Sequence, residues 1–409
     1  MDSSLPQIRV SHSDITQPEC CFSNVATYRT PKMDRYIPNR SLNDLEKSHH
    51  YFVENRRGFQ KILNFSTYSI PSKINTDFLN LTPAKVARKV NTQSFLVLDA
   101  PEIEKNFYFN LLDWSESSML AVGLGKEVYL WNLKTNSSYE LNTSPRETGG
   151  IVSSVRWISD ELLAIANQDC VELWNVNNRK CISTFEHTNK VTCIDVNDRI
   201  LTSSSFLNNK IFCHDYRTKT KIAEYSSADT ICSLKWNPSG RFLAAGNSQG
   251  TVEIRDINCG LRNAEVYATL NKHCSGFKAL SWCPWQNSLL ATGGGFCDKK
   301  INFWNVYCSK KIKTLQVQSQ VGSIVWSKQH REILYTDFDD MVICKYPSMD
   351  KLAEINDHCD RVINAALNKD EILASLSADE TIRLWNVFQN GPKRTPLSVK
   401  KLDCFQNIR

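Results

Sequence analysis

The stretch Ile382-Arg383-Leu384-Trp385-Asn386-Val387, near the end of the chain, is the clearest copy of a unit that recurs seven times. In each copy a strand-like run leads to an anchor position, which is tryptophan in four of the seven. The anchors are Trp131, Trp174, His214, Arg255, Trp304, Lys345 and Trp385. They are separated by 43, 40, 41, 49, 41 and 40 residues, so the chain is a series of seven similar units.

This spacing predicts the fold class. A period of about 40–45 residues with a Trp-Asp-like pair is typical of WD repeats, each of which supplies a four-stranded blade of a β-propeller. Short β-branched and aromatic runs punctuated by Asn, Gly, Ser and Pro fit such strands. We therefore predict an all-β protein, with a seven-bladed WD-repeat β-propeller over residues 94–388. Residues 1–93 are polar and aperiodic, which predicts a largely disordered N-terminal arm, and 389–409 form a C-terminal tail.

The way the ring closes can also be inferred. Blade seven supplies three strands, near 362–367, 371–376 and 381–387, and then meets Asn390-Gly391-Pro392, which ends regular structure. Its outer strand is missing on the C-terminal side. The strand pattern 94–98, which precedes blade one, is the natural donor, because pairing it there closes the ring and removes an exposed edge.

Blade seven contains His358, Asp379 and Trp385, with Ser375 or Ser377 in reach of them. On paper this set resembles a catalytic triad. However, the histidine position recurs as His187 in blade three and His273 in blade five, so we interpret the set as a buried brace that rigidifies a blade. The glycine run 293–295 lacks the Lys-Ser/Thr of a phosphate loop. We predict that the protein is not an enzyme and binds no cofactor or metal.

Charge is concentrated in the arm. The 409 residues carry a net charge of +6, and residues 1–93 hold 13 Lys and Arg against 8 Asp and Glu, which gives the arm +5. A nucleic-acid binder would concentrate more charge on its folded face, so we expect the arm to dock to proteins. A steep salt dependence of retention on DNA or RNA would favour the opposite interpretation.

The cysteines and the apolar segments indicate the compartment. None of the fifteen cysteines is spaced as C-x-x-C, and Cys193, Cys213, Cys232 and Cys344 fall inside strand patterns, where a free cysteine behaves as a small buried hydrophobe. We expect reduced core thiols and a location in the nucleus and cytoplasm. There is no apolar run of about 18 residues and no charged-then-apolar start, so we expect neither a membrane span nor a signal peptide.

Three segments outside the predicted propeller break the polar pattern. In the segment 34–40, Pro38 holds Ile37 in extended geometry between two arginines, a form that suits a groove with acidic edges. Taken alone, this segment fits an ordinary solvated peptide equally well. Lys61-Ile62-Leu63-Asn64-Phe65 is a short apolar plug, and Ile408-Arg409 ends the chain with an apolar anchor, a guanidinium and a carboxylate.

Together these pieces resemble one family, the Fizzy and Fizzy-related WD-repeat proteins, which are co-activators of the anaphase-promoting complex (cyclosome). The segment 34–40 resembles the family's C-box, Leu-Asp-Ala-Pro-Glu at 98–102 resembles its entry into blade one, and Ile408-Arg409 resembles its terminal Ile-Arg tail. Other propeller segments resemble the family at 109–115, 121–125, 282–286 and 291–295. The likeness runs from about residue 31 to residue 409, and blade five leans toward the Fizzy (mitotic) branch.

The resemblance implies a substrate-recruiting adaptor and activator of that ubiquitin ligase. Its partners would be subunits of the complex, degron-bearing substrates and checkpoint inhibitors, and its role would lie in mitotic or meiotic progression. The residues implied in docking to the complex are Asp34, Arg35, Tyr36, Ile37, Pro38, Arg40, Lys61, Ile62, Leu63, Ile408 and Arg409. Those implied in degron binding are Leu98 and Asp99 for the destruction box, and Gln320 and Arg383 for the Lys-Glu-Asn degron.

The Lys-Glu-Asn pocket departs from the family pattern. Ser248 and Gly250 replace asparagines, and Phe296 stands where a hydroxyl residue is usual. Each lost hydrogen-bond partner would cost roughly 1–3 kcal/mol, which predicts weak or altered reading of that degron and fits a specialised, meiotic paralogue.

Four Ser-Pro or Thr-Pro pairs are candidate phosphorylation sites, at Thr30, Thr82, Ser144 and Thr395. A phosphate on Thr30 would oppose docking of the basic segment 34–40 to an acidic site. The alternative function is a WD-repeat scaffold or decoy in another assembly, without co-activator activity.

Overall fold

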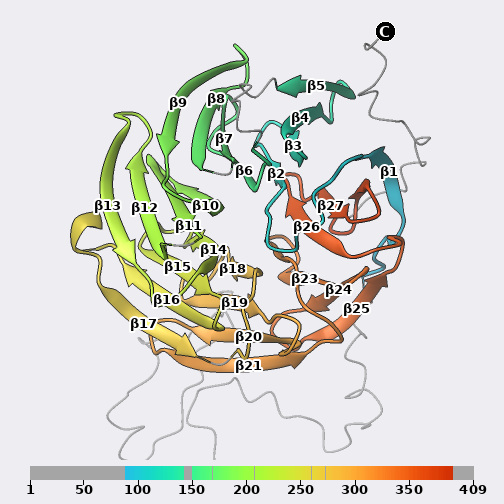
Figure 1. Ribbon diagram of the computed structural model, residues 1–409. Coiled ribbons are helices and arrows are strands. Elements are labelled where there is room, and N and C mark those ends of the chain that lie inside the picture. Colours follow the sequence, from blue (N-terminus) through green and yellow to red (C-terminus); the bar gives the residue numbers. More distant parts are fainter. Residues whose placement is uncertain are drawn as a thin grey trace, which may run out of the picture. The chain divides into compact units, whose positions relative to one another are not determined.

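The computed structural model describes residues 88–141, 150–167, 169–206, 208–258, 260–271 and 273–389. Within these ranges the chain forms seven four-stranded sheets, and every strand pair in them is antiparallel. Figure 1 shows the sheets arranged as blades around a common centre. The prediction of an all-β, seven-bladed propeller is confirmed.

Each blade is built in chain order from the centre to the rim, apart from the last. Blade one consists of β2 (Leu112–Trp114), β3 (Met119–Leu124), β4 (Glu127–Asn132) and β5 (Ser137–Leu141). Blade two consists of β6 (Ser154–Trp157), β7 (Leu162–Asn167), β8 (Cys170–Asn175) and β9 (Lys180–Glu186). Blade three consists of β10 (Val191–Asn197), β11 (Ile200–Ser205), β12 (Lys210–Asp215) and β13 (Thr220–Ser226), and blade four of β14 (Ile231–Trp236), β15 (Phe242–Asn247), β16 (Thr251–Asp256) and β17 (Val266–Asn271). Blade five consists of β18 (Leu280–Trp282), β19 (Leu289–Gly293), β20 (Lys300–Asn305) and β21 (Lys310–Gln316). Blade six consists of β22 (Ile324–Ser327), β23 (Glu332–Asp337), β24 (Asp340–Lys345) and β25 (Asp350–Ile355). Blade seven consists of β26 (Val362–Leu367), β27 (Leu373–Ser377), β28 (Thr381–Trp385) and, from the start of the propeller, β1 (Ser94–Asp99). A 3-10 turn, η2 (Leu261–Asn263), lies between β16 and β17.

The repeat anchors all lie in the third strand of a blade, which is the position that the period predicts. The second strands are the most deeply buried, because both of their faces are covered by neighbouring blades. In β15 every residue from Phe242 to Asn247 is buried, and in β23 every residue from Glu332 to Asp337 is buried. The core therefore lies between the blades, as a series of apolar layers.

The ring closes as the sequence predicts. β1 pairs antiparallel with β28, with Leu96 opposite Leu384 and Leu98 opposite Ile382, so a strand from before blade one becomes the outer strand of blade seven. Four bounds differ from the prediction. β1 extends to Asp99, β27 runs from Leu373 to Ser377 in place of 371–376, and β28 ends at Trp385.

Arg88 adds a side-chain hydrogen bond and an ion pair that stabilise this closure. Its Nη1 donates to the carbonyl of Val387 at 2.6 Å, and its guanidinium forms an ion pair with Glu332 of blade six. Because the pair is largely buried, it is shielded from solvent screening, and it links the chain before β1 to two blades.

The cysteine prediction is confirmed where the structure describes it. Cys193, Cys213, Cys232 and Cys344 are buried, and every cysteine in the described ranges is free. Four others are exposed: Cys274, Cys297, Cys308 and Cys359. These lie in loops, so core packing does not account for them. In the same ranges no helix is long and apolar enough to cross a membrane.

Leu98 tests the closure. Its side chain is 2% exposed and packs in the core cluster that joins blades seven and one. We expect Leu98→Ala to lower the free energy of unfolding by about 2–5 kcal/mol, as for other buried leucines. Val97→Ala, on the half-buried face of the same strand, is the matched control. Chemical denaturation of both variants checks this, and equal losses would contradict the closure argument.

Candidate functional site

The triad-like set in blade seven is a buried hydrogen-bonded chain. Trp385 Nε1 donates to Ser375 Oγ at 2.8 Å, the same hydroxyl lies 2.8 Å from His358 Nε2, and His358 Nδ1 lies 2.9 Å from Asp379. Ser377 is not part of it, because its hydroxyl donates to the carbonyl of Asp360 at 2.7 Å. With the serine hydroxyl held by a tryptophan in the blade interior, the set is arranged to support a blade.

Asp379, the acidic member of this hydrogen-bonded set, is held in its carboxylate form. Burial acts to raise the pKa of Asp379, but hydrogen bonds from His358, from the Thr381 hydroxyl and from the Cys359 backbone outweigh it, and the net effect is a lowered pKa. A carboxylate that accepts several hydrogen bonds fixes the loop before β28. The structural role predicted for His358, Asp379 and Trp385 agrees with this geometry.

Blade five contains an equally complete brace, which the sequence analysis did not credit. Trp304 Nε1 donates to Thr292 Oγ1 at 2.9 Å, His273 Nε2 lies 2.7 Å from the same hydroxyl, and His273 Nδ1 pairs with Asp298. Threonine here takes the place of serine. The recurrence in a second blade supports the interpretation that these sets are architectural.

Blade three keeps only part of the brace. His187 Nε2 lies 3.1 Å from Ser203 Oγ, but the anchor is His214, which packs on Phe185 with ring centres 4.8 Å apart. Burial, reinforced by His214, lowers the pKa of His187 to about 4. Burial, with Lys221 nearby, likewise lowers the pKa of His214 to about 4. Both rings are therefore neutral in the folded protein near neutral pH.

The two residues predicted for the destruction box differ in exposure. Leu98 is 2% exposed and faces the core. Its side chain can therefore shape a groove only by packing beneath the residues that line it. Asp99 is half-buried at the end of β1, opposite Thr381, where its carboxylate can meet a ligand. The following residue continues the pairing, because the Ala100 amide donates to the Glu380 carbonyl at 2.7 Å.

Gln320 and Arg383 are in different settings. Arg383 lies in β28, where its Nη1 is 3.6 Å from Asp357 and its side chain is 19% exposed. Gln320 lies in the loop before β22. A Cβ placed on Gly322 of that loop would lie 2.9 Å from the carbonyl of Val362, at the start of β26.

The arginine next to Val362 is Arg361, which the sequence analysis missed. Its Nη2 donates to the carbonyl of Lys105 at 3.2 Å, and its Cζ lies 5.4 Å from the ring centre of Phe107. The only sequence signal was its place immediately before an inner strand. The structure thus offers Arg361, in addition to Arg383, as a cation beside the loop that contains Gln320.

Three residues that depart from the family pattern belong to adjoining loops. A Cβ on Gly276 would lie 2.9 Å from the backbone of Ser248, and one on Gly295 would lie 2.2 Å from the carbonyl of Gly276. Phe296, next along the chain, is 69% exposed, the highest value among the large apolar side chains that the structure describes. A large apolar ring therefore projects where a polar contact was expected.

Lys278 crosses the centre of the ring. From just before β18 of blade five, its Nζ donates to the carbonyls of Phe109 and Ile363, at 2.5 and 2.8 Å, and to Asn364 Oδ1 at 3.1 Å. Burial, with Arg361 nearby, holds the pKa of Lys278 well below its usual range. This lysine joins blade five to blade seven and to the segment that enters blade one.

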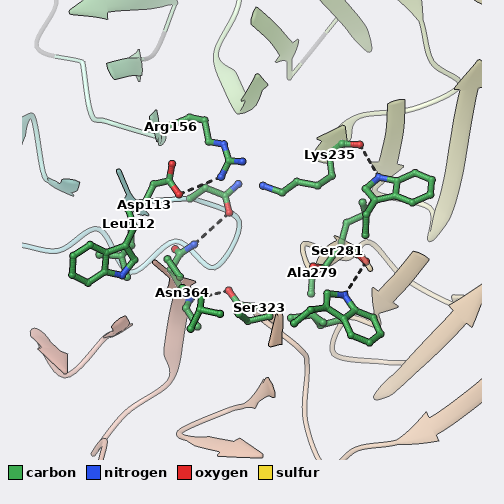
Figure 2. A pocket seen from close by; sticks show the side chains of 18 of the residues that line it. Leu112, Asp113, Arg156, Lys235, Ala279, Ser281, Ser323 and Asn364 are labelled. Atoms are coloured by element: carbon green, nitrogen blue, oxygen red, sulfur yellow. Dashed lines mark hydrogen bonds and ion pairs between the residues drawn. The ribbon is translucent and has the colours of Figure 1, made fainter. Parts of the chain in front are cut away.

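The central cavity has a volume of about 790 Å³ and is lined by residues of all seven inner strands. Figure 2 shows Arg156 next to Asp113, and Lys235 reaching into the cavity from another blade. Arg156 is paired with Asp113 at 3.2 Å and Asp195 at 3.0 Å, and Lys235 lies 3.4 Å from the same Asp195. These charges are satisfied by one another. Among the described residues no group of three or more His, Cys, Asp or Glu side chains could hold a metal ion.

The predicted docking segments 34–40, 61–63 and 408–409 lie outside the described residues, as do the candidate phosphorylation sites Thr30, Thr82, Ser144 and Thr395.

The propeller resembles known proteins in sequence and in fold. The family description "CDC20/Fizzy WD40 domain" matches residues 98–385, from the end of the closing strand to the anchor of blade seven. The chain belongs to the CDC20/Fizzy family. Within that family, it is 35% identical to "Cell division cycle 20.5, cofactor of APC complex" of Arabidopsis thaliana, over 90% of each chain.

Two further matches extend the comparison. The chain is 37% identical to "Anaphase-promoting complex subunit cdc20" of Dictyostelium discoideum, over 76% of this chain and 63% of the relative. Among solved structures, a chain of "Crystal Structure of Mitotic Checkpoint Complex" matches with a TM-score of 0.69 and 34% identity, covering 74% of this chain and 97% of that chain.

The neutral histidines of blade three predict a pH dependence. Because their folded-state pKa lies below the unfolded value of about 6.5, their contribution to stability is present above that value and is lost as pH falls from about 6.5 toward 4. We expect His214→Phe to reduce the loss of stability between pH 7 and pH 5 by about 1–2 kcal/mol. Chemical denaturation at both pH values measures it, and an unchanged loss would refute the assignment.

Proposed function

We propose that this protein is a substrate-recruiting activator of the anaphase-promoting complex ubiquitin ligase, and that it promotes ubiquitination of destruction-box proteins during cell-cycle progression. The observation that carries the proposal is the CDC20/Fizzy match over residues 98–385, in a chain that also contains the segments 34–40 and 408–409. Relatives named as a cofactor and as a subunit of that complex support it.

The proposed division of labour follows the chain. The segment 34–40, with 61–63 and the terminal Ile408-Arg409, docks to the ligase by apolar anchors and guanidinium–carboxylate pairs. The propeller holds the substrate while other subunits catalyse ubiquitin transfer. The His358 and Ser375 side chains are hydrogen-bonded to each other, and Ser375 to Trp385, inside blade seven, which fits an adaptor rather than an enzyme.

Two surfaces of the propeller are proposed to read degrons. Asp99, at the accessible end of the closing strand, would pair with the arginine of a destruction box. The loops that contain Gln320 and Arg361 would face the Lys-Glu-Asn degron, where a guanidinium can bind the glutamate. Arg383 remains a second candidate for that role, although Asp357 already neutralises part of its charge.

Checkpoint proteins are proposed as further partners, because a solved relative is part of the mitotic checkpoint complex. We also propose a location in the nucleus and cytoplasm, which the free, mostly buried cysteines fit. A meiotic specialisation would suit the altered loops around Phe296 and Ser248. Phosphorylation at Thr30 would then weaken docking of the adjacent basic segment.

The decisive experiment is ubiquitination of a destruction-box substrate by purified anaphase-promoting complex with this protein as the only activator. We expect Arg35→Ala, and a chain lacking Ile408-Arg409, to lose both binding to the complex and activity. Asp99→Asn is the matched control: it should bind the complex normally and fail only in substrate ubiquitination, because it removes the charge that meets the degron.

The outcomes separate the alternatives. Failure of the intact protein to bind the complex would refute the proposal and leave a propeller scaffold. Binding without activity would identify a decoy or inhibitor.

Phe296 gives a test of degron choice. We expect the wild-type protein to bind a Lys-Glu-Asn peptide weakly, and Phe296→Thr to bind it about tenfold more tightly, because a hydroxyl replaces an exposed ring and supplies a hydrogen bond. Fluorescence anisotropy with a labelled peptide measures the affinity, and Tyr267→Thr, which alters an exposed ring in the outer strand β17, is the control. Equal affinity of wild type and Phe296→Thr would show that Phe296 does not limit this degron.

A further inference from the structure

The outer strand of blade five differs in charge from every other outer strand. β21 contains three lysines and no acidic residue, a net charge of +3. The outer strands β9, β13 and β17 are neutral, and β1, β5 and β25 each carry −1. Each outer strand is the last of its sheet, and Figure 1 shows β21 at the rim. Blade five therefore presents a basic edge between neighbours that are neutral or acidic.

The equivalent lysines of two other blades have partners within their own strand. Lys221 Nζ lies 2.7 Å from Glu224 in β13, and Lys351 Nζ lies 2.6 Å from Glu354 in β25. Both lysines are the second residue of the strand, as Lys311 is in β21. In these two outer strands, a lysine at the second position is thus neutralised by a glutamate three residues later.

β21 has no acidic residue at the position that neutralises the lysine in β13 and β25. The position three residues after Lys311 is Thr314, whose hydroxyl donates to Asn302 Oδ1 at 2.8 Å. Among the described residues, no ion pair joins Lys310 or Lys311 to a carboxylate. Lys313 is used differently, because its Nζ donates to the carbonyl of Ser348 in blade six at 2.6 Å.

Apolar side chains accompany these two lysines. Ile312 is 52% exposed and occupies a bulge, since the pairing with β20 passes from Lys311 directly to Lys313. Tyr307, in the turn that leads into the strand, is 48% exposed. A basic edge that also exposes an aliphatic and an aromatic side chain has the character of a binding surface more than of a solvated rim.

We propose that the free edge of β21 docks an acidic, extended segment of a partner protein as a fifth strand of blade five. Backbone hydrogen bonds would supply affinity. Carboxylates on the segment would meet Lys310 on one face of the strand and Lys311 on the other, and a neighbouring apolar residue would pack on Ile312. Lysines on an edge disfavour pairing with apolar strands, which would remove the ammonium groups from water, and with basic strands, which carry like charge. An acidic partner is therefore selected by its charge.

The chemistry favours a peptide over a nucleic acid. The basic surface is one strand wide and about 10 Å long, because its lysines lie within the four residues 310–313 at about 3.3 Å per residue, and it contains no arginine. The adjacent outer strands carry no net positive charge, so a phosphate backbone would find no continuous basic track. This inference is independent of the proposed role in ubiquitination.

The test uses the full chain and a fluorescent nonapeptide made of three Glu-Glu-Val repeats, which places carboxylates on both faces of an added strand. Anisotropy at two salt concentrations should show binding that weakens as salt rises. Lys310→Glu combined with Lys311→Glu should lower the affinity at least tenfold. Lys180→Glu, which changes the first residue of the outer strand of blade two, is the matched control and should leave the affinity unchanged.

Two further probes separate charge from strand addition. The same peptide N-methylated at alternate residues keeps its charge but cannot pair along one edge, and we expect it to bind at least tenfold more weakly. Equal binding of the methylated peptide, or equal loss in Lys180→Glu, would overturn the proposal. So would displacement of the acidic peptide by single-stranded RNA. Thermal melting of each variant confirms that it is folded.

Discussion

The pairing of β1 with β28 is the constraint on which the propeller depends. Six blades are each made from one continuous stretch of chain, and only the seventh joins strands that are nearly 300 residues apart in the sequence. Once Leu96 and Leu98 lie against Leu384 and Ile382, the last blade has its fourth strand and packs on the first. The same strand carries Asp99, so the residue proposed to meet a degron is held by the ring closure itself.

Much of this architecture could be predicted from the sequence because the repeat is periodic. The anchors at 40- to 49-residue spacing locate the third strand of every blade, even where Lys345 or Arg255 replaces tryptophan. The absence of a fourth strand at the C-terminal side of blade seven could be inferred by counting its strand patterns, of which there are three. Strand bounds were less certain by one or two residues, because hydrogen bonding at a strand end depends on its neighbour and not on its own residues.

The site was harder to predict, for a physical reason. Sequence comparison places residues along the chain, whereas a surface is made of loops from different blades. Arg361 was missed because nothing in its local sequence shows that Val362 lies against the loop of Gln320. Lys278 was missed because a buried lysine is recognisable only by its acceptors, which are Phe109, Ile363 and Asn364.

Closure by a strand from the start of the propeller has a consequence for synthesis on the ribosome. β1 ends at Asp99 and its partner β28 ends at Trp385, so 286 residues separate the two ends. At about 5–20 residues per second, roughly 15–60 s pass between the emergence of the two strands. Throughout that interval Phe95, Leu96 and Leu98 have no partner strand, and the nascent chain exposes an apolar strand that only its own last blade can cover. The pairing that closes the finished ring is thus the last strand pairing that synthesis makes possible.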